Sequence, residues 1–306
     1  MEKQQIIVEG QNKQKVQIHY YEINETYVLL NLQSYDREEL EVKVHISLFA
    51  TLVSILQRVL LKWDGVILVT GDVGDGKSTL AQLVSTIWEW FFNRHQELDV
   101  IVWTSQNFTT LIEREDNETS CILWDEAIQG GTGRDTITKQ GQALKKAFVT
   151  KRYKRHLYLL LVDEIQEYNK KIISRTRCWI HVFTNGLERG YFKIYTNKTQ
   201  IRRIYRKIKK FDLEIEEVMN SERAQYQGFQ PDTSDLFYNP KEYQKRKEEE
   251  TNKEEEKPMT EKDKKHMEQR NKLVAELIKQ GMKQKDVASI IGIDRVQISH
   301  IINGTR

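Results

Sequence analysis

The sequence has no run of about eighteen apolar residues, and its first residues, MEKQQIIVEG, lack the apolar core of a secretory signal peptide. Both absences argue against a membrane-spanning or secreted protein, so we expect a soluble, cytoplasmic chain. Cysteine is scarce as well, and Cys121 and Cys178 each lie in an apolar, strand-like run. We therefore expect buried free thiols in a reducing compartment, and neither a disulfide framework nor a zinc site.

Proline is equally rare, and its three occurrences, Pro231, Pro240 and Pro258, fall close together. The stretch KEYQKRKEEETNKEEEKP is nearly free of apolar residues, and a segment of this composition cannot bury enough apolar surface to fold alone. We interpret residues 222–266 as a charged flexible linker, partly helical where Glu and Lys alternate. The net charge of +3 is the small difference between 48 basic and 45 acidic side chains, so local clusters of charge are more informative than the total.

The hydrophobic pattern divides the rest of the chain into three parts. Residues 1–63 contain period-two stretches such as KVQIHYY and then a long apolar helix, which predicts a small antiparallel β subdomain. Residues 64–221 alternate strands and helices, which predicts a three-layer α/β domain with a mainly parallel sheet. Residues 267–306 return to helical periodicity and predict a compact all-α module. In the α/β part we expect strands at 65–70, 99–104, 121–124, 157–162, 178–183 and 190–196, and helices at 77–92, 136–153 and 164–174.

The segment GDVGDGKST matches GxxxxGK[ST] without a mismatch, between an apolar strand and an amphipathic helix. In such a loop, successive backbone N–H groups surround the phosphates of a nucleotide, and the helix amino terminus adds positive potential. We assign ATP and Mg²⁺ as ligands, with Lys77 on the outer phosphates and the Ser78 hydroxyl on the metal. The predicted nucleotide-binding residues are Gly71, Asp72, Val73, Gly74, Asp75, Gly76, Lys77, Ser78 and Thr79.

Two apolar runs end in an Asp-Glu pair, CILWDEAI and LYLLLVDEIQ. In P-loop ATPases with a catalytic glutamate, the third strand in chain order bears the metal-directing aspartate, and here that strand is 121–124. Asp125 is therefore predicted to hold the Mg²⁺ shell, and Glu126 to orient and deprotonate the attacking water. Asp163 follows the fourth strand. It fits either a helix cap paired with Gln166 or a γ-phosphate sensor, a role that Gln166 also fits.

The succession of GDVGDGKST, CILWDEA, the basic segment KKAFVTKRYKRH and the charged helix ending SRTRCWIHV resembles the FtsK/HerA-like DNA-translocating ATPases over about residues 60–197. It is similar in particular to short forms from phages, plasmids and archaeal viruses, and to the ATPase domain of zonular occludens toxin-like phage proteins. Many of these relatives have a glutamine where this chain has Asp163. The resemblance implies a ring, expected to be a hexamer, in which an arginine of the neighbouring subunit completes each active site. Candidates for that arginine are Arg152 and Arg155, and the favoured pair Arg175 and Arg177.

Two further segments are candidates for contact with DNA phosphates. The glycine-rich stretch 129–140 fits either a loop that faces a central pore or a simple flexible loop. A helix predicted at 198–220 carries seven basic residues between Lys198 and Lys210, and fits either a phosphate-contacting face or an ordinary charged helix. The basic side chains of the first segment and its surroundings are Arg134, Lys139, Lys145 and Lys146. Those predicted for the helix face are Arg202, Arg203 and Arg206, with Lys209 or Lys210.

The carboxyl-terminal module fits a helix-turn-helix. With Gln284 as its first position, Ala288 falls where the two helices approach closely and Gly292 at the turn that requires positive φ. In the same register Ile293, Ile298 and Ile301 point inward. The segment resembles the recognition units of resolvases and repressors, while a helical hairpin for protein contact is the alternative. A second helix at about 294–302 would present polar side chains to the major groove. The DNA-binding residues predicted are Arg295, Gln297, Ser299, His300 and Asn303, with Arg306 near phosphates.

Two functions accommodate these motifs. The first is an ATP-hydrolysing, ring-forming DNA-translocating motor of a virus, phage or plasmid, brought to duplex DNA by its helix-turn-helix. The second is an ATP-regulated DNA-binding switch, such as a replication initiator, a transposition regulator or a transcription factor. A membrane-associated assembly ATPase is disfavoured because the sequence shows no membrane span.

Overall fold

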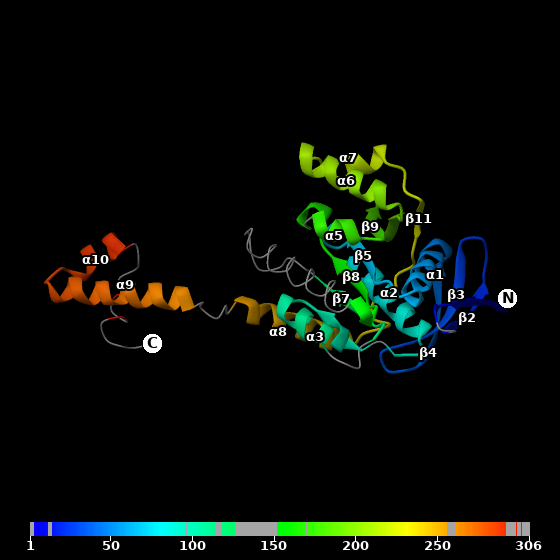
Figure 1. The fold of residues 1–306 in the computed structure, drawn as a ribbon, viewed down its shortest axis with the longest axis horizontal. Helices are drawn as coiled ribbons and strands as arrows, with labels where there is room; N and C mark the ends of the chain where they lie inside the picture. The colour runs from blue at the N-terminus through cyan, green and yellow to red at the C-terminus, as the bar shows by residue number, and fades with distance from the viewer. Residues whose placement is uncertain are drawn as a thin grey trace. The chain divides into compact units, whose positions relative to one another are not determined.

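The computed structural model describes residues 3–11, 14–95, 97–113, 118–125, 152–168, 170–255, 261–291, 298 and 301. It contains two compact units, unit 1 (Met1–Glu255) and unit 2 (Glu256–Arg306) (Figure 1). None of the described helices has the length and apolarity needed to cross a bilayer.

An antiparallel sheet begins unit 1, and its four strands pair in chain order. The strands are β1 (Lys3–Glu9), β2 (Lys15–Glu22), β3 (Tyr27–Gln33) and β4 (Glu39–His45). Buried and exposed residues alternate along β2, as the period-two pattern predicts. The buried face packs on α1 (Ile46–Leu60), which begins where the His45 ring accepts a hydrogen bond from the Ser47 N–H at 3.2 Å.

The central sheet has the strand order β11-β10-β9-β5-β8-β7-β6. Strands β9, β5, β8, β7 and β6 are parallel, and β10 and β11 extend the sheet antiparallel. Every residue of β5, β7 and β8 is buried, because helices cover both faces of a parallel sheet. The predicted α/β class with a mostly parallel sheet is confirmed. The strand bounds are β5 (Gly65–Thr70), β6 (Ile101–Val102), β7 (Cys121–Trp124), β8 (Leu157–Leu161), β9 (Cys178–Asn185), β10 (Glu188–Tyr195) and β11 (Tyr226–Phe229).

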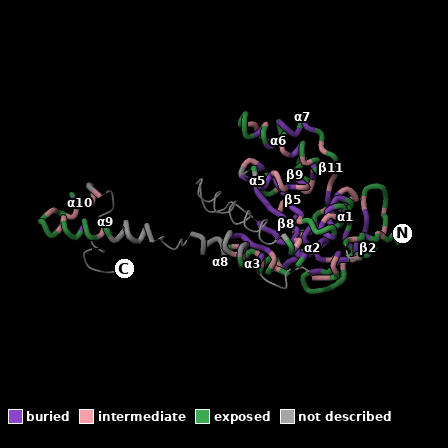
Figure 2. Tube along the Cα trace, viewed as in Figure 1, coloured by how far each residue is buried: buried purple, intermediate pink, exposed green. Residues whose placement is uncertain are grey.

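Two hydrophobic cores lie on opposite faces of this sheet, and Figure 2 shows buried segments concentrated there. Along β5, Ile67 and Val69 contribute to the core that contains α1, α2 (Lys77–Phe91) and the amino-terminal sheet. Val66 and Leu68 contribute to the other core. That core is completed by α3 (Ser105–Glu113), α5 (Lys170–Arg175), α6 (Lys198–Phe211) and α7 (Ile215–Ser221). Both cysteines are buried free thiols, as expected.

Several predicted elements differ in length. The strand expected at 99–104 is reduced to β6 and follows a 3-10 turn, η2 (Leu98–Val100). The helix expected at 164–174 is divided into η4 (Ile165–Glu167) and α5. The basic helix expected at 198–220 is two helices, because Asp212 adopts a left-handed conformation that ends α6. Of the helix expected at 136–153, the described part is η3 (Arg152–Lys154), and the rest lies outside the described residues.

The flexible linker predicted at 222–266 is wrong over most of its length. β11 pairs with β10, so β10 is not an edge strand, and Phe237 and Tyr238 enter the core with relative exposures of 1% and 3%. A helix, α8 (Pro240–Glu255), then belongs to unit 1. Composition missed this arrangement because a few aromatic side chains anchor a segment whose other residues are charged and exposed.

The described residues of unit 2 include two helices, α9 (Glu261–Lys279) and α10 (Gln284–Ile291). The turn between them includes Gly281, whose φ of 89° favours glycine. Val274, Val287 and Ile298 form a small buried core, with Ala288 and Ile301 packed against it. The inward positions predicted for Ile298 and Ile301 agree with this packing. Gly292 and Ile293 lie outside the described residues.

Candidate nucleotide site and DNA-binding module

The strand order brings three predicted site segments to one edge of the central sheet. β8 lies between β5 and β7, and all three are parallel, so their carboxyl ends meet at this edge. The phosphate loop follows β5, Asp163 follows β8 and Asp125 follows β7. The Gly71 N–H donates to the Asp163 carbonyl at 3.3 Å, which joins two of the segments directly. Ligands of parallel α/β sheets bind in this position.

The phosphate loop has a backbone that its glycines permit. Gly74 and Gly76 have φ of 94° and 97°, and Gly76 directly precedes α2. A Cβ at Gly71 would lie 2.2 Å from the Val182 carbonyl oxygen, so no larger residue fits there without moving β9. Asp75 steadies the loop, because its carboxylate accepts hydrogen bonds from the Asp72 N–H at 2.8 Å and from a β9 hydroxyl, that of Thr184, at 2.6 Å.

The Lys77 amine lies across the loop. Its Nζ donates to the carbonyl oxygens of Gly71 and Asp72 at 2.6 and 2.8 Å, and it forms an ion pair with the Asp163 carboxylate at 2.8 Å. The predicted neighbourhood of Asp163 and the loop is therefore observed. A capping box would need the Gln166 side chain to accept from the Asp163 N–H, and the described residues show no such bond. The Gln166 amide instead donates to the Glu164 carboxylate.

The two residues predicted to hold Mg²⁺, Ser78 and Asp125, lie side by side. Asp125 is 1% exposed, and the Ser78 hydroxyl lies 3.2 and 3.3 Å from its two carboxylate oxygens. None of the ion pairs among the described residues neutralises this buried carboxylate. A hydroxyl beside a buried, unneutralised carboxylate is an oxygen donor set that suits Mg²⁺. Glu126, the predicted catalytic base, lies outside the described residues.

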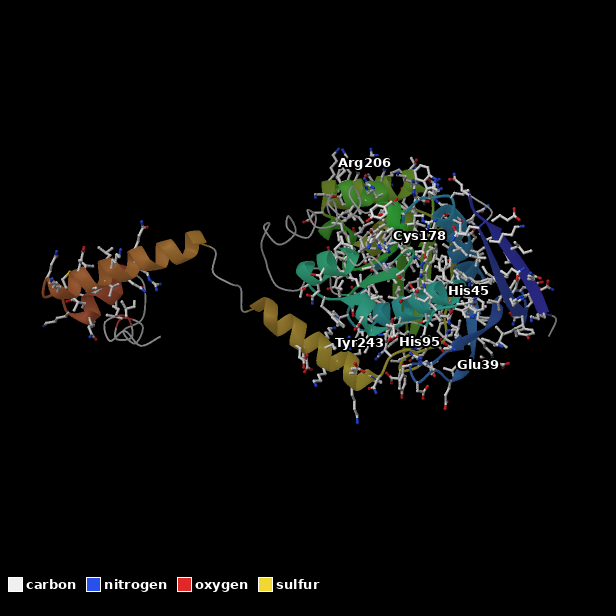
Figure 3. All side chains as sticks on the ribbon, turned by 60° about the horizontal axis from the view of Figure 1, so that its bottom comes forward. Glu39, His45, His95, Cys178, Arg206 and Tyr243 are labelled. Carbon is white, nitrogen blue, oxygen red and sulfur yellow. The ribbon has the colours of Figure 1, made fainter. Side chains whose placement is uncertain are left out.

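Tyr243 is a site residue that the sequence analysis missed. It lies in the first turn of α8 (Figure 3). Its hydroxyl donates a hydrogen bond to Oδ2 of Asp125. Burial and the neighbouring Asp125 carboxylate raise the pKa of the Tyr243 hydroxyl far above its usual value, so it remains protonated. The sequence did contain a signal for α8. The Asn239 side chain accepts from the Lys241 N–H at 3.1 Å, so Asn-Pro is a helix start with an N-cap and proline at the first position.

A buried polar network between β5 and β9 lies just before the phosphate loop. Thr70, the last residue of β5, accepts a hydrogen bond from the Trp179 indole at 2.8 Å, and its hydroxyl lies 3.0 Å from Nδ1 of His181. Burial is the main cause that lowers the pKa of His181 to about 4, so the ring is neutral near pH 7. These bonds fix the end of β5 from which the loop departs.

A cavity of about 80 Å³ lies beside the loop. Three segments line it, namely Gly76, Thr79 and Leu80, then Arg189 and Gly190, then residues 230–234. Within it, Thr233 is 4% exposed, and its hydroxyl has no hydrogen-bond partner among the described residues.

The favoured trans arginines lie at the opposite edge of the sheet. The Arg177 N–H donates to the Val66 carbonyl at the start of β5, and Arg175 pairs with Asp64 at 3.7 Å. Val66 and Gly71 are five positions apart, which amounts to roughly 16 Å along the strand. Neither arginine therefore belongs to the nucleotide site of its own chain. Arg152 also precedes its strand, but its side chain lies outside the described residues.

The basic face of α6 divides into paired and exposed side chains. Arg203 forms an ion pair with the buried Glu222 at 2.5 Å, so it holds α6 to the segment after α7. The Arg202 guanidinium donates to the Ser174 carbonyl at 3.2 Å. Arg206 is exposed on the outside of unit 1 (Figure 3). Of the three arginines predicted to contact DNA, Arg203 and Arg206 are exposed and Arg202 is half-buried.

Comparison with known proteins supports the carboxyl-terminal module. A family model described as Helix-turn-helix matches residues 273–306. DNA binding by this module is therefore supported, although Arg295, Gln297, Ser299, His300 and Asn303 lie outside the described residues. The crystal structure of the N-terminal domain of zonular occludens toxin from Neisseria meningitidis is similar at 13% identity, with a TM-score of 0.37, over 57% of this chain and 100% of that chain. No curated protein matches.

Proposed function

We propose that the chain binds and hydrolyses ATP with Mg²⁺ and couples this reaction to DNA. The observation that carries the proposal is the convergence of Lys77, Ser78 and Asp125 at the carboxyl ends of parallel strands, in a chain that also has a helix-turn-helix. Strand β8 lies between β5, which carries the phosphate loop, and β7, which carries Asp125. This strand order supports assignment to the class of P-loop ATPases that have an additional strand at this position.

In the proposed reaction, Lys77 leaves Asp163 to contact the outer phosphates, and the backbone N–H groups of the loop hold the remaining oxygens. Ser78 and Asp125 would hold Mg²⁺, which supplies charge neutralisation on the phosphates when bound. Glu126 would accept the proton of the attacking water. The cavity lined by Thr79 and Leu80 would receive part of the nucleoside.

The experiment is a comparison of Mg²⁺-dependent ATP hydrolysis by the wild-type chain and Lys77→Ala. We expect hydrolysis to fall to background in the variant, because no other cation in the described loop reaches the phosphates. Thermal unfolding serves as the control for folding. ATP turnover by Lys77→Ala at the wild-type rate would rule out this nucleotide site.

We propose the ring-forming DNA-translocating motor as the task of this site. The ATP-regulated DNA-binding switch remains the second candidate, and one observation favours it. The Asp125 carboxylate is hydrogen-bonded to α8, the last element of unit 1 before the DNA-binding module in the chain.

A further inference from the structure

Three kinds of contact hold α8 on the nucleotide-binding domain. The Tyr243 ring packs edge-on against Trp103, with ring centroids 5.5 Å apart, and its hydroxyl donates to Asp125. One turn later, Arg246 pairs with Asp99 at 2.7 Å. Among the described residues, these contacts anchor a strongly charged helix to unit 1.

The Tyr243 hydroxyl is bonded to the carboxylate that is proposed to hold the divalent cation. Asp125 accepts from Tyr243 on Oδ2, while the Ser78 hydroxyl lies within 3.3 Å of both carboxylate oxygens. Mg²⁺ demands near-octahedral oxygen coordination, with waters that donate to nearby carboxylates. A hydroxyl that already donates to Asp125 takes an acceptor site from that shell.

We propose that the Tyr243 hydroxyl and the metal–nucleotide complex compete for the Asp125 carboxylate. Docking of α8 would then oppose loading of the metal–nucleotide complex, and loading would oppose docking. This inference rests on the proposed nucleotide site. In the chain, α8 directly precedes the segment that leads to the helix-turn-helix. If α8 were released from unit 1, it would lengthen the tether of the helix-turn-helix. Metal–nucleotide loading would thereby change the reach of the DNA-binding module.

The test uses Mn²⁺ as the cation and a non-hydrolysable fluorescent ATP analogue, with Tyr243→Phe in the full-length chain. The variant keeps the ring against Trp103 and removes the hydroxyl. We expect Mn²⁺ affinity, read by electron paramagnetic resonance in the presence of the analogue, to rise about tenfold, since a hydrogen bond to a charged group is lost as a competitor. Binding of the analogue in EDTA should not change.

Tyr238→Phe is the matched control, because its ring lies 6.2 Å from that of Tyr243 and its hydroxyl faces Ser85. Asp99→Asn is the second variant, because it removes the ion pair with Arg246 and so weakens α8 docking without changing Asp125. It should also raise Mn²⁺ affinity. In the wild-type chain, the analogue with Mn²⁺ should also speed proteolysis within α8, whereas the analogue in EDTA should not.

The outcomes separate the two proposals. Unchanged or weaker Mn²⁺ binding in Tyr243→Phe, with the analogue still bound in EDTA, would overturn the competition and leave the nucleotide site intact. Failure of the wild-type chain to bind the analogue at all would overturn the nucleotide site, and the competition with it.

Discussion

The Asp163 carboxylate raises the question of why an acidic side chain stands at the phosphate loop. It pairs with Lys77 at 2.8 Å, yet it is 59% exposed, so water screens much of this attraction. The pair keeps the amine at the loop, and a triphosphate would have to displace it. A carboxylate left beside bound phosphates would then repel them.

Asp163→Asn is therefore expected to strengthen Mg²⁺-free nucleotide binding severalfold, because the competing charge is removed. Titration with a fluorescent ATP analogue measures the change. Glu164→Gln is the matched control, since it removes the neighbouring charge without breaking the Lys77 pair. A loss of hydrolysis with unchanged binding would instead assign Asp163 the sensor role.

Two buried histidines predict how stability depends on pH. Burial, reinforced in part by Lys154, lowers the pKa of His156 to about 3, and burial lowers that of His181 to about 4. Unfolded histidine titrates near 6.5, so between about pH 6.5 and 4 the unfolded chain binds more protons and stability falls as pH falls.

Near pH 5 each of these histidines should contribute about one proton taken up on unfolding. Denaturant unfolding from pH 7.5 to 5 measures that slope. His156→Gln should lower it by about one proton, and an unchanged slope in this variant would contradict the assignment. His181→Gln gives the equivalent value for the ring behind the phosphate loop.

Elements with a strong local signature were predictable. The loop sequence, β5 and α2 required only local pattern, and the bounds of β5 and β7 agree with those expected. Counting strands correctly placed Asp125 and Asp163 because parallel strands have their carboxyl ends at one edge. β11 and the docking of α8 on unit 1 were missed, since both depend on distant contacts. Examples are the Gln230 side chain bonded to His45 N–H at 3.0 Å, and Tyr243 on Asp125.

The corrected boundary determines where the DNA-binding module can be removed. A chain ending at residue 210 would lose β11, Phe237 and α8 from unit 1, so it should unfold or aggregate. A chain ending at Glu255 should retain the fold and nucleotide binding but lose most duplex affinity, because the helix-turn-helix match begins at residue 273. Fluorescence anisotropy with duplex DNA measures this change, and full affinity in the shorter chain would move DNA binding to unit 1.

For the whole molecule, the two candidate functions differ in what DNA does to hydrolysis. A motor steps along duplex, so its turnover should increase with duplex length beyond the few base pairs that a helix-turn-helix covers. A switch needs its binding site alone, so its turnover should be independent of added length. Glu126→Gln, which removes the proposed base, should in addition trap a DNA-bound assembly if the protein is a motor.

The position of Arg175 and Arg177 makes the motor proposal testable without DNA. They lie at the edge of the sheet opposite their own loop, so a catalytic role would have to be exercised on a neighbouring subunit. Lys77→Ala subunits lack a working phosphate loop but keep both arginines. Arg175→Ala/Arg177→Ala subunits keep the phosphate loop but lack both arginines. Mixing two such inactive proteins should restore part of the hydrolysis if an arginine acts in trans. Arg175 forms an ion pair with the Asp64 carboxylate, so its loss could affect folding. Thermal unfolding must therefore first show that the double variant is folded. A folded mixture that stays inactive would remove these arginines from the active site and favour the switch.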